Sequence, residues 1–346
     1  MSPETGNTRV FRRTRRVLPP DASRPARGPL IRRLLCLVRQ PLSFVPVTSG
    51  PGSRRFARLI TQTMKHLVVR NVLAFGAWLL VALPAFSQVA SRPGPANVGA
   101  YYSSFDSTRI YYQLQGQGLP VVLLHGFAST LESWHHTPLQ RELVAQGYQV
   151  VALDLRGNGH SGQPTGLAGY EHDAEARDVM GLATALGFAH YQVIGYSRGS
   201  IIAARLLELD PRVTAAVLGG MGEAFTNPNW PRRIAFYQAL SGEKASPALA
   251  GFVQSLPSRG LDRQTLAWQQ QAQPSTSAAA LARVRIPVLV VSGEDDHDNG
   301  SAEALGKLIP GAAVKRVPGV HATTAQSAGF AREVLLFLQR CRGPVR

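Results

Sequence analysis

The 346-residue sequence predicts an α/β fold whose mostly parallel, doubly wound sheet is covered by helices on both faces. Unbroken apolar runs alternate with amphipathic segments along the chain, a pattern typical of strands that are buried on both faces. Three of these runs end in turns that carry glycine and polar residues, at His125-Gly126, at Asp154-Leu155-Arg156-Gly157 and at Gly195 to Gly199. Parallel sheets place their sites at the carboxyl ends of the strands, so the chemistry is expected there.

The first two strands are expected at residues 100–105 and 109–114, as a hairpin split by Asp106-Ser107. Further strands are expected at residues 120–124, 149–155, 191–194, 213–219, 286–291 and 313–317. Amphipathic patterns predict helices at residues 134–145, 170–186, 201–209, 302–308 and 330–339. The folded domain is expected to span residues 99–341.

The alternation stops between Met221 and Ala282, over a length that a simple crossover does not need. A disordered insert would be poor in aromatic residues, whereas this segment is rich in them, including Trp230, Phe236 and Phe252. We therefore expect residues 222–282 to form a small helical lid over the site.

The net charge of +16 is concentrated at the N-terminus. Residues 1–63 hold 13 arginines against two acids, Glu4 and Asp21, and carry +11 of that charge. The rest of the chain carries only +5 and has no obvious basic stripe, which argues against nucleic-acid binding. The composition of residues 1–63 predicts a disordered basic leader.

A secretory signal peptide is expected at residues 64–87, followed by a linker at 88–98. Lys65 and Arg70 precede an apolar stretch at residues 72–83, and small residues then allow cleavage after Ser87. Because signal peptides normally begin at the initiator, we hypothesise that Met64 is the true start.

Two other interpretations of the N-terminus remain open. One is a twin-arginine signal at Arg54-Arg55, although the residues that follow it fit poorly. The other is an uncleaved N-terminal anchor. The expected location is secreted or periplasmic, with the membrane involved only in export.

The run from Val193 to Ser200 predicts a strand, a sharp Gly-x-Ser-x-Gly turn and a helix, which is the context of a nucleophile elbow. Gly195 and Gly199 have no Cβ, so the turn around Ser197 can close tightly. A serine hydroxyl needs such a position, beside a base and backbone donors, because it is a poor nucleophile when free.

With His125-Gly126-Phe127 and the turn at residues 154–161, this elbow resembles the α/β-hydrolase fold superfamily, in its serine esterase or lipase-like branch, over roughly residues 98–341. The resemblance implies the order nucleophile, acid, histidine, which Ser197, Asp296 and His321 obey. Asp295 remains an alternative acid and Asp298 a more distant one. A solvated acidic loop or a cation site is the other interpretation of this loop. Val320 stands where the family usually has a polar residue.

The resemblance also implies an oxyanion hole formed by the backbone N–H groups of Phe127 and Arg198. The side chain of Arg198 is expected either to pair with an acid of the scaffold or to reach a substrate carboxylate. None of the histidines shows a metal-ligand spacing with a second soft ligand, so no metal is expected, and no cofactor is expected either.

The sequence therefore predicts a serine hydrolase that cleaves a carboxylic ester, or a related acyl bond, of a small molecule with an apolar group. A serine at the elbow argues against the dehalogenase and epoxide-hydrolase branches, in which an aspartate attacks. Amides, lactones, carbon–carbon bonds and cofactor-free perhydrolysis remain open. Two alternatives are a catalytically silent binding or interaction module and a protein tethered to anionic lipid by its basic leader. Substrate identity and oligomeric state are not predicted.

Overall fold

The computed structural model describes residues 98–135 and 137–342. The expected leader, the expected signal peptide and the linker up to residue 97 lie outside the described residues. The described strands form an eight-stranded sheet in the order β1-β2-β4-β3-β5-β6-β7-β8. Their bounds are β1 Val98–Ser103, β2 Arg109–Gln115, β3 Leu119–Leu124, β4 Tyr148–Leu153, β5 Tyr191–Tyr196, β6 Val213–Gly219, β7 Val288–Gly293 and β8 Ala313–Val317.

Most of the sheet is parallel, as predicted. The pairs from β4 through β3, β5, β6 and β7 to β8 are parallel, whereas β1 pairs with β2, and β2 with β4, in antiparallel register. The parallel strands therefore point their carboxyl ends toward one edge of the sheet, where the turns that carry the candidate site residues lie.

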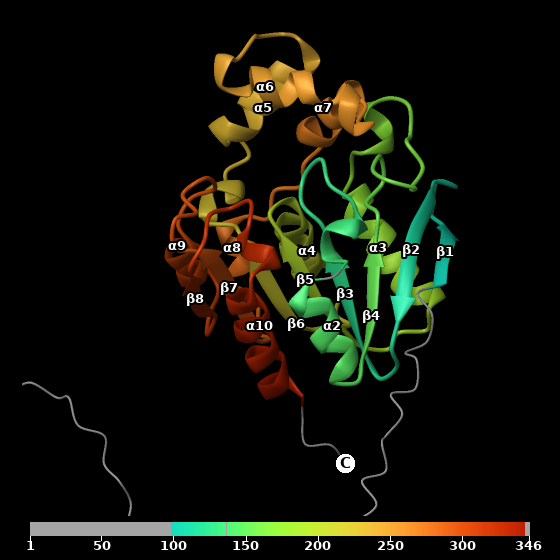
Figure 1. Cartoon of the computed structure of the whole chain (residues 1–346), viewed down its shortest axis with the longest axis vertical. Helices are drawn as coiled ribbons and strands as arrows, with labels where there is room; N and C mark the ends of the chain where they lie inside the picture. Colours follow the sequence, from blue (N-terminus) through green and yellow to red (C-terminus); the bar gives the residue numbers. More distant parts are fainter. Residues whose placement is uncertain (1–97, 136, 343–346) are drawn as a thin grey trace, which may run out of the picture. The chain divides into compact units, whose positions relative to one another are not determined.

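Helices cover both faces of the sheet, which confirms the doubly wound architecture. One apolar cluster joins alternate strand residues such as Val122 and Leu124 to helices α3, α4 and α9. A second cluster joins the intervening residues, such as Val121 and Leu123, to α2 and α10. Figure 1 shows α2 and α10 in front of the sheet. The helix bounds are α2 Pro138–Ala145, α3 Ala174–Ala185, α4 Arg198–Leu209, α9 Ala302–Leu308 and α10 Ala328–Cys341.

Two helices begin later than the sequence predicts. The helix expected from residue 134 begins at Pro138, because Thr137 caps it and Leu131–Trp134 forms a separate 3₁₀-helix. The helix expected from residue 170 begins at Ala174, because His172 and Asp173 have φ of 56° and 59°. Residues in this left-handed conformation do not continue a right-handed helix.

The segment expected to be a lid is helical. It contains 3₁₀-helices at Glu223–Thr226 and Pro257–Arg259 and the helices α5 Pro231–Ser241, α6 Pro247–Ser255, α7 Arg263–Gln271 and α8 Ala278–Leu281. A small apolar cluster with Leu240, Leu256 and Leu266 at its centre packs α5 and α7 against Phe127 and Ala128. Helices α5, α6 and α7 lie above the carboxyl ends of the strands (Figure 1). Their role as a lid stays a prediction.

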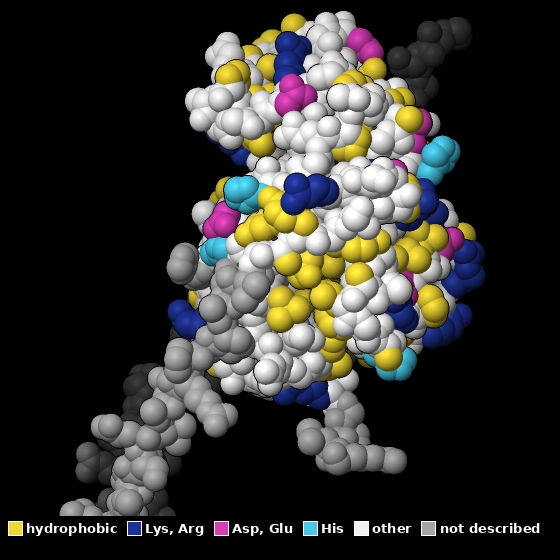
Figure 2. Space-filling view, turned by 90° about the vertical axis from the view of Figure 1, so that its right-hand side faces the viewer, with side chains coloured by type: hydrophobic (Ala, Val, Ile, Leu, Met, Phe, Trp, Pro, Cys, Tyr) yellow, Lys and Arg dark blue, Asp and Glu magenta, His cyan; other side chains and the backbone are white. Residues whose placement is uncertain are grey.

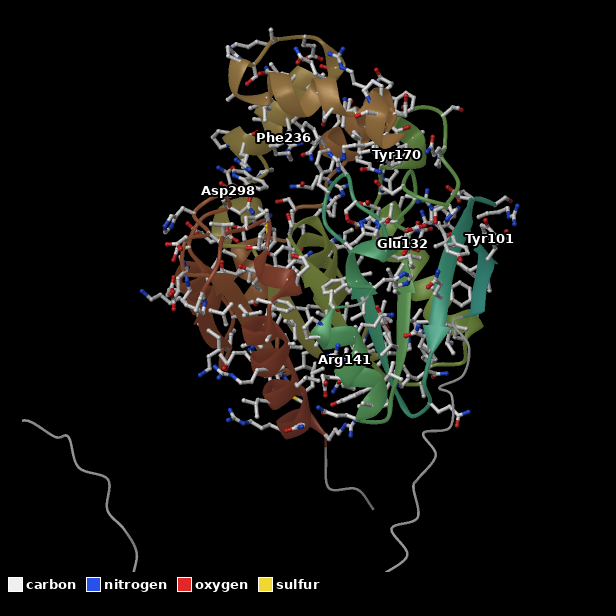
Figure 3. The ribbon with its side chains drawn as sticks, in the orientation of Figure 1. Tyr101, Glu132, Arg141, Tyr170, Phe236 and Asp298 are labelled. Carbon is white, nitrogen blue, oxygen red and sulfur yellow. The ribbon has the colours of Figure 1, made fainter. Side chains whose placement is uncertain are left out.

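Strand β1 forms one edge of the sheet. Tyr101, on β1, and Phe105, just after it, are exposed. Figure 2 faces this edge and shows hydrophobic side chains gathered over it, and Tyr101 is labelled there in Figure 3.

None of the helices in the described part of the chain is long and apolar enough to cross a membrane.

Candidate active site

Ser197 follows β5 directly and has φ 53° and ψ −120°, a conformation that costs about 1–3 kcal/mol in a residue other than glycine. Its N–H donates to the Gly219 carbonyl at 2.8 Å. The two glycines of the motif make this turn possible. A Cβ on Gly195 would lie 2.2 Å from the Gly199 carbonyl oxygen, and a Cβ on Gly199 would lie 2.1 Å from that of Leu124. The serine is therefore held out at the end of the strand on a tight, strained turn.

The structure brings Ser197, His321 and Asp296 together. The Oγ of Ser197 lies 3.0 Å from Nε2 of His321, and Nδ1 of His321 lies 2.8 Å from Oδ2 of Asp296. The Tyr196 hydroxyl donates to the His321 carbonyl at 2.6 Å and holds the histidine turn against the elbow. In this arrangement a base faces the serine hydroxyl and a carboxylate orients the base.

The carboxylate that contacts His321 is that of Asp296, which is buried, whereas Asp295 is exposed. Burial alone raises the pKa of Asp296, but the hydrogen bond with His321, the charge of His321 and the N–H of Asp298 outweigh burial and lower this pKa below its usual value. Asp296 is therefore ionised at neutral pH, as the orienting group of such an arrangement must be.

Asn299 also belongs to this site, although no sequence motif predicts it. Its side-chain amide donates to the Gly220 carbonyl at 3.1 Å and lies 3.4 Å from Nδ1 of His321. The residue is buried and lines the cavity beside Ser197. A single asparagine in a polar loop carries no sequence signal of this position.

The loop after β3 approaches the serine closely. A Cβ on Gly126 would lie 3.4 Å from that of Ser197. The ring of His125 holds this loop, because its Nδ1 lies 2.8 Å from the Gly126 carbonyl and its Nε2 accepts the Leu155 N–H at 3.0 Å. Burial lowers the pKa of His125, so the ring is neutral and Nδ1 carries the proton.

The backbone N–H groups expected to form the oxyanion hole have no protein acceptor within residues 98–135 and 137–342. Phe127 lies in the loop after β3, and Arg198 is the first residue of α4, where backbone N–H groups have no partner inside the helix. Both residues line the cavity that contains Ser197. Their role in holding an oxyanion stays a prediction.

Two cavities meet at Ser197 and share Phe127, Ser197 and His321. The first, of about 200 Å³, reaches under α5 and α6 and is lined by aromatic residues that include Trp230, Phe236 and Phe252. The second, of about 340 Å³, lies on the side of His125 and Trp134. A substrate can therefore extend in two directions from the serine.

A family model described as alpha/beta hydrolase fold matches residues 120–245. The non-heme chloroperoxidase of Streptomyces lividans is 32% identical over 253 residues, which are 62% of this chain and 90% of that protein. This chain belongs to the alpha/beta hydrolase fold family.

Solved structures of the alpha/beta hydrolase fold agree with this assignment. A hydrolase from Pseudomonas aeruginosa PA01 superposes with a TM-score of 0.56 at 26% identity, over 70% of this chain and 99% of that one. An esterase from Rhodococcus sp. ECU1013 superposes with a TM-score of 0.54 at 27% identity, again over 70% of this chain and 99% of that one.

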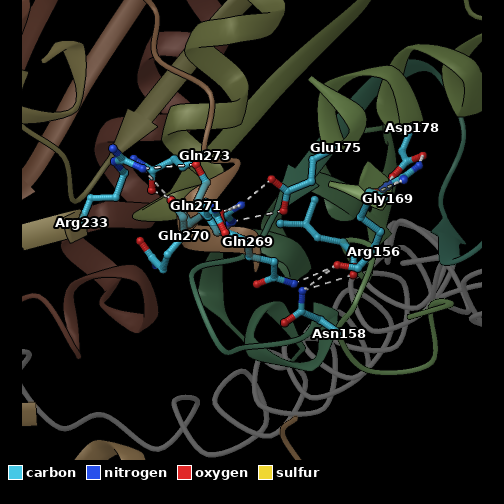
Figure 4. A network of polar contacts seen from close by, with 12 residues as sticks. Arg156, Asn158, Gly169, Glu175, Asp178, Arg233, Gln269, Gln270, Gln271 and Gln273 are labelled. Atoms are coloured by element: carbon cyan, nitrogen blue, oxygen red, sulfur yellow. Dashed lines mark hydrogen bonds and ion pairs between the residues drawn. The ribbon is translucent and has the colours of Figure 1, made fainter. Parts of the chain in front are cut away.

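In this alpha/beta hydrolase the side chain of Arg198 pairs with Glu175. Nε donates to Oε1 at 3.1 Å and Nη2 donates to Oε2 at 2.6 Å. Nη2 also donates to the Gln269 carbonyl on α7 at 2.9 Å. Figure 4 shows Glu175 and Gln269 within this network. Of the two expectations for Arg198, the structure shows the ion pair with the scaffold.

Asp296, Asp298 and His321 are spaced so that one ligand atom from each lies within 4.8 Å of the others. This spacing would accommodate a cation. However, Nδ1 of His321 and Oδ2 of Asp296 are already joined at 2.8 Å, and a cation between them would replace that hydrogen bond. The pair can therefore orient the histidine or ligate a cation, but it cannot do both at once.

Proposed function

We propose that this protein is a serine hydrolase that cleaves a carboxylic ester of a small molecule through an acyl-enzyme. The observation that carries the proposal is the alignment of Ser197, His321 and Asp296 with contacts of 3.0 and 2.8 Å at a cavity. A hydroxyl, a base and a buried carboxylate in this order are the requirements for nucleophilic acyl transfer.

In the acylation step the Oγ of Ser197 attacks the ester carbonyl carbon while Nε2 of His321 takes the hydroxyl proton. The carbonyl oxygen becomes an oxyanion that accepts hydrogen bonds from the N–H groups of Phe127 and Arg198. The carbon–oxygen bond to the alcohol then breaks, and His321 returns its proton to the leaving oxygen.

In the deacylation step a water molecule gives a proton to His321 and its oxygen attacks the acyl carbon. The bond to Ser197 breaks, the serine recovers the proton, and the carboxylic acid leaves. Asp296 remains ionised throughout, because its pKa is below the usual value, and it stabilises the imidazolium that forms in both steps.

Perhydrolysis is the second candidate function, and the name of the Streptomyces lividans relative, a non-heme chloroperoxidase, favours it. The first half of the reaction is unchanged. Hydrogen peroxide then attacks the acyl carbon in place of water while His321 takes its proton. The bond to Ser197 breaks, the serine recovers the proton, and a peracid leaves instead of an acid. No cofactor takes part in this sequence.

The test is to react the protein, from Gln88 onward, with a fluorophosphonate probe and with p-nitrophenyl esters of increasing acyl length, with Ser197→Ala as the control. Labelling and turnover that are lost in the variant support the serine mechanism. Adding hydrogen peroxide and measuring peracid separates the two candidates. A folded wild type that neither labels nor turns over would contradict the proposal and favour a binding module.

Export across a membrane is proposed from the layout of residues 64–87 alone, which lie outside the described residues. The expected mature protein begins at Gln88. Intact-mass measurement of the native protein tests this, and any peptide from residues 1–63 would overturn the hypothesis that Met64 is the start.

A further inference from the structure

The cavity under α5 and α6 is lined by several positively charged side chains. Arg198, Arg232 and Arg233 line it together with Ser197, and no Asp or Glu is among the described residues that line it. Arg198 is neutralised by Glu175, since both side chains are 3–4% exposed and joined by two hydrogen bonds. The charge of the cavity wall therefore depends on the other two arginines.

Arg232 has an acid partner outside the cavity wall. Its Nη2 lies 3.3 Å from Oδ2 of Asp298, in the loop after β7, and the two side chains are 40% and 49% exposed. Figure 3 labels this aspartate, and also Phe236 on α5. A pair this exposed is strongly screened by water, so Arg232 contributes little to the field inside the cavity.

Arg233 has no acid partner in the described part of the chain. Nη1 donates to the carbonyls of Gln270 and Gln271 at 2.9 and 3.3 Å, and Nη2 donates to the Pro228 carbonyl at 2.6 Å. Figure 4 shows this arginine beside the residues that end α7. Its Nε–H has no acceptor among the described residues, so the guanidinium is held in place with donor capacity left over.

The surroundings of Arg233 leave its charge largely unbalanced. Burial lowers the pKa of the guanidinium and no neighbouring acid raises it, although an arginine stays charged at neutral pH. The residue lies in the first turn of α5, a helix with no acid in that turn, where the helix dipole adds positive potential. The carbonyls at the end of α7 offset only part of this charge.

We propose that Arg233 binds a carboxylate of the substrate, so that the ester cleaved at Ser197 is an anionic one. This inference rests on the proposed function. A guanidinium presents a planar set of donors that matches a carboxylate. The apolar walls formed by Trp230 and Phe236 fit a short hydrocarbon part between the carboxylate and the ester, and a volume of about 200 Å³ fits a small substrate.

The competing explanation is that Arg233 only joins α5 to the end of α7. A purely structural role would affect every substrate alike, whereas an anion site affects only charged ones. The test therefore uses matched esters. One is the 4-nitrophenyl monoester of glutaric acid, and its partner has a primary amide in place of the free carboxylate. A second pair, acetyl esters of 4-hydroxybutanoate and of its amide, places the charge on the alcohol.

The variant is Arg233→Gln, and Arg285→Gln is the matched control. Arg285 is exposed, bonds only to the carbonyls of Ala282 and Val284, and does not line either cavity. We expect Arg233→Gln to lower kcat/KM for the carboxylate ester of at least one pair by about 10–100-fold and to leave its amide within about twofold. Arg233→Lys should retain part of the preference, because it keeps the charge, and Arg285→Gln should change neither ester.

A wild type that does not prefer a carboxylate in either pair would overturn the inference. Equal losses on carboxylate and amide, with a lowered Tm, would assign Arg233 a structural role instead. If no ester is turned over, the proposed function has failed, and calorimetric titration of Ser197→Ala with the same esters decides the inference by itself. Tighter binding of the carboxylate that Arg233→Gln abolishes would support it, whereas equal affinities or no binding would refute it.

Discussion

Replacing Glu175 by glutamine should destabilise the fold, because it leaves the Arg198 guanidinium buried without its counterion. The two side chains are 3–4% exposed and share contacts of 3.1 and 2.6 Å. Removing one partner of such a buried pair costs roughly 3–5 kcal/mol. Glutamine keeps one acceptor oxygen and Gln269 still accepts from Arg198, so we expect a loss near the lower end, about 3 kcal/mol.

Chemical denaturation followed by circular dichroism measures this free energy of unfolding. In thermal denaturation the same loss should lower the Tm by roughly 6–12 °C. Glu142→Gln is the matched control. Its glutamate lies 3.7 Å from Arg141, and the pair is 44% and 69% exposed, so the same chemical change should cost at most about 1 kcal/mol.

A double variant separates charge from packing. Replacing Glu175 by leucine and Arg198 by methionine removes both charges and keeps similar volumes, so it should regain most of the lost stability. A loss of stability in Glu175→Gln no larger than that in Glu142→Gln would contradict the expected cost of an unpaired buried guanidinium. A double variant less stable than Glu175→Gln would contradict it too, because the pair would then stabilise the fold by more than its mutual neutralisation.

Asp296→Asn should lower kcat roughly 10³–10⁴-fold, whereas Asp295→Asn should retain activity within about twofold, and equal losses would contradict the geometry. The lowered pKa of Asp296 contributes stability that is present above the unfolded-state pKa of about 4 and is lost as the pH falls through the lower folded-state pKa. The difference in urea stability between wild type and Asp296→Asn should therefore shrink from pH 7 to pH 2, and a constant difference would contradict this. Gly195→Ala, whose Cβ would lie 2.2 Å from the Gly199 carbonyl oxygen, should cost more than about 2 kcal/mol or prevent folding. Gly251→Ala, with open space around it in α6, should instead gain roughly 0.5–1 kcal/mol, and similar effects at the two glycines would contradict the strain argument.

The strands could be predicted because each carries its own signal. A parallel strand buried on both faces needs an unbroken apolar run, and all six residues of β5 are buried in the structure. The order of the strands in the sheet could not be predicted in this way. The placement of β4 between β2 and β3 depends on pairings between segments far apart in the chain, and no single segment reports them.

In the candidate site, too, some residues could be predicted from local sequence and others could not. The glycine spacing around Ser197 is local, so a motif identifies it, and His321 follows from its place after the last strand. The choice between Asp295 and Asp296 is not local. It depends on which of the two points inward in the folded loop, and there the N–H of Asp295 donates to the Gly319 carbonyl while the side chain of Asp296 meets His321.

The partner of Arg198 was also beyond local patterns. Glu175 lies 23 residues earlier, on α3, and becomes its partner only because α3 and α4 pack on the same face of the sheet. Asn299 meets His321 for a similar reason, since both lie in loops that follow neighbouring strands of the sheet. Charge and polarity in a sequence predict that partners are needed, but tertiary packing decides which residues supply them.

Hydrogen bonds to the end of α7 hold both the proposed anion site and the residue that follows the nucleophile, and Figure 4 shows the end of α7 between them. Arg233 is bonded to the carbonyl of Gln270, and the neighbouring Gln269 accepts from Arg198, the residue that follows Ser197. The end of α7 therefore sets the position of the cation relative to the serine before any substrate binds. Fixing both ends of a substrate in advance lowers the entropy lost on reaching the transition state. An anionic group held this way would align the ester carbonyl with the serine, so the loss in Arg233→Gln should extend to kcat and not be confined to KM.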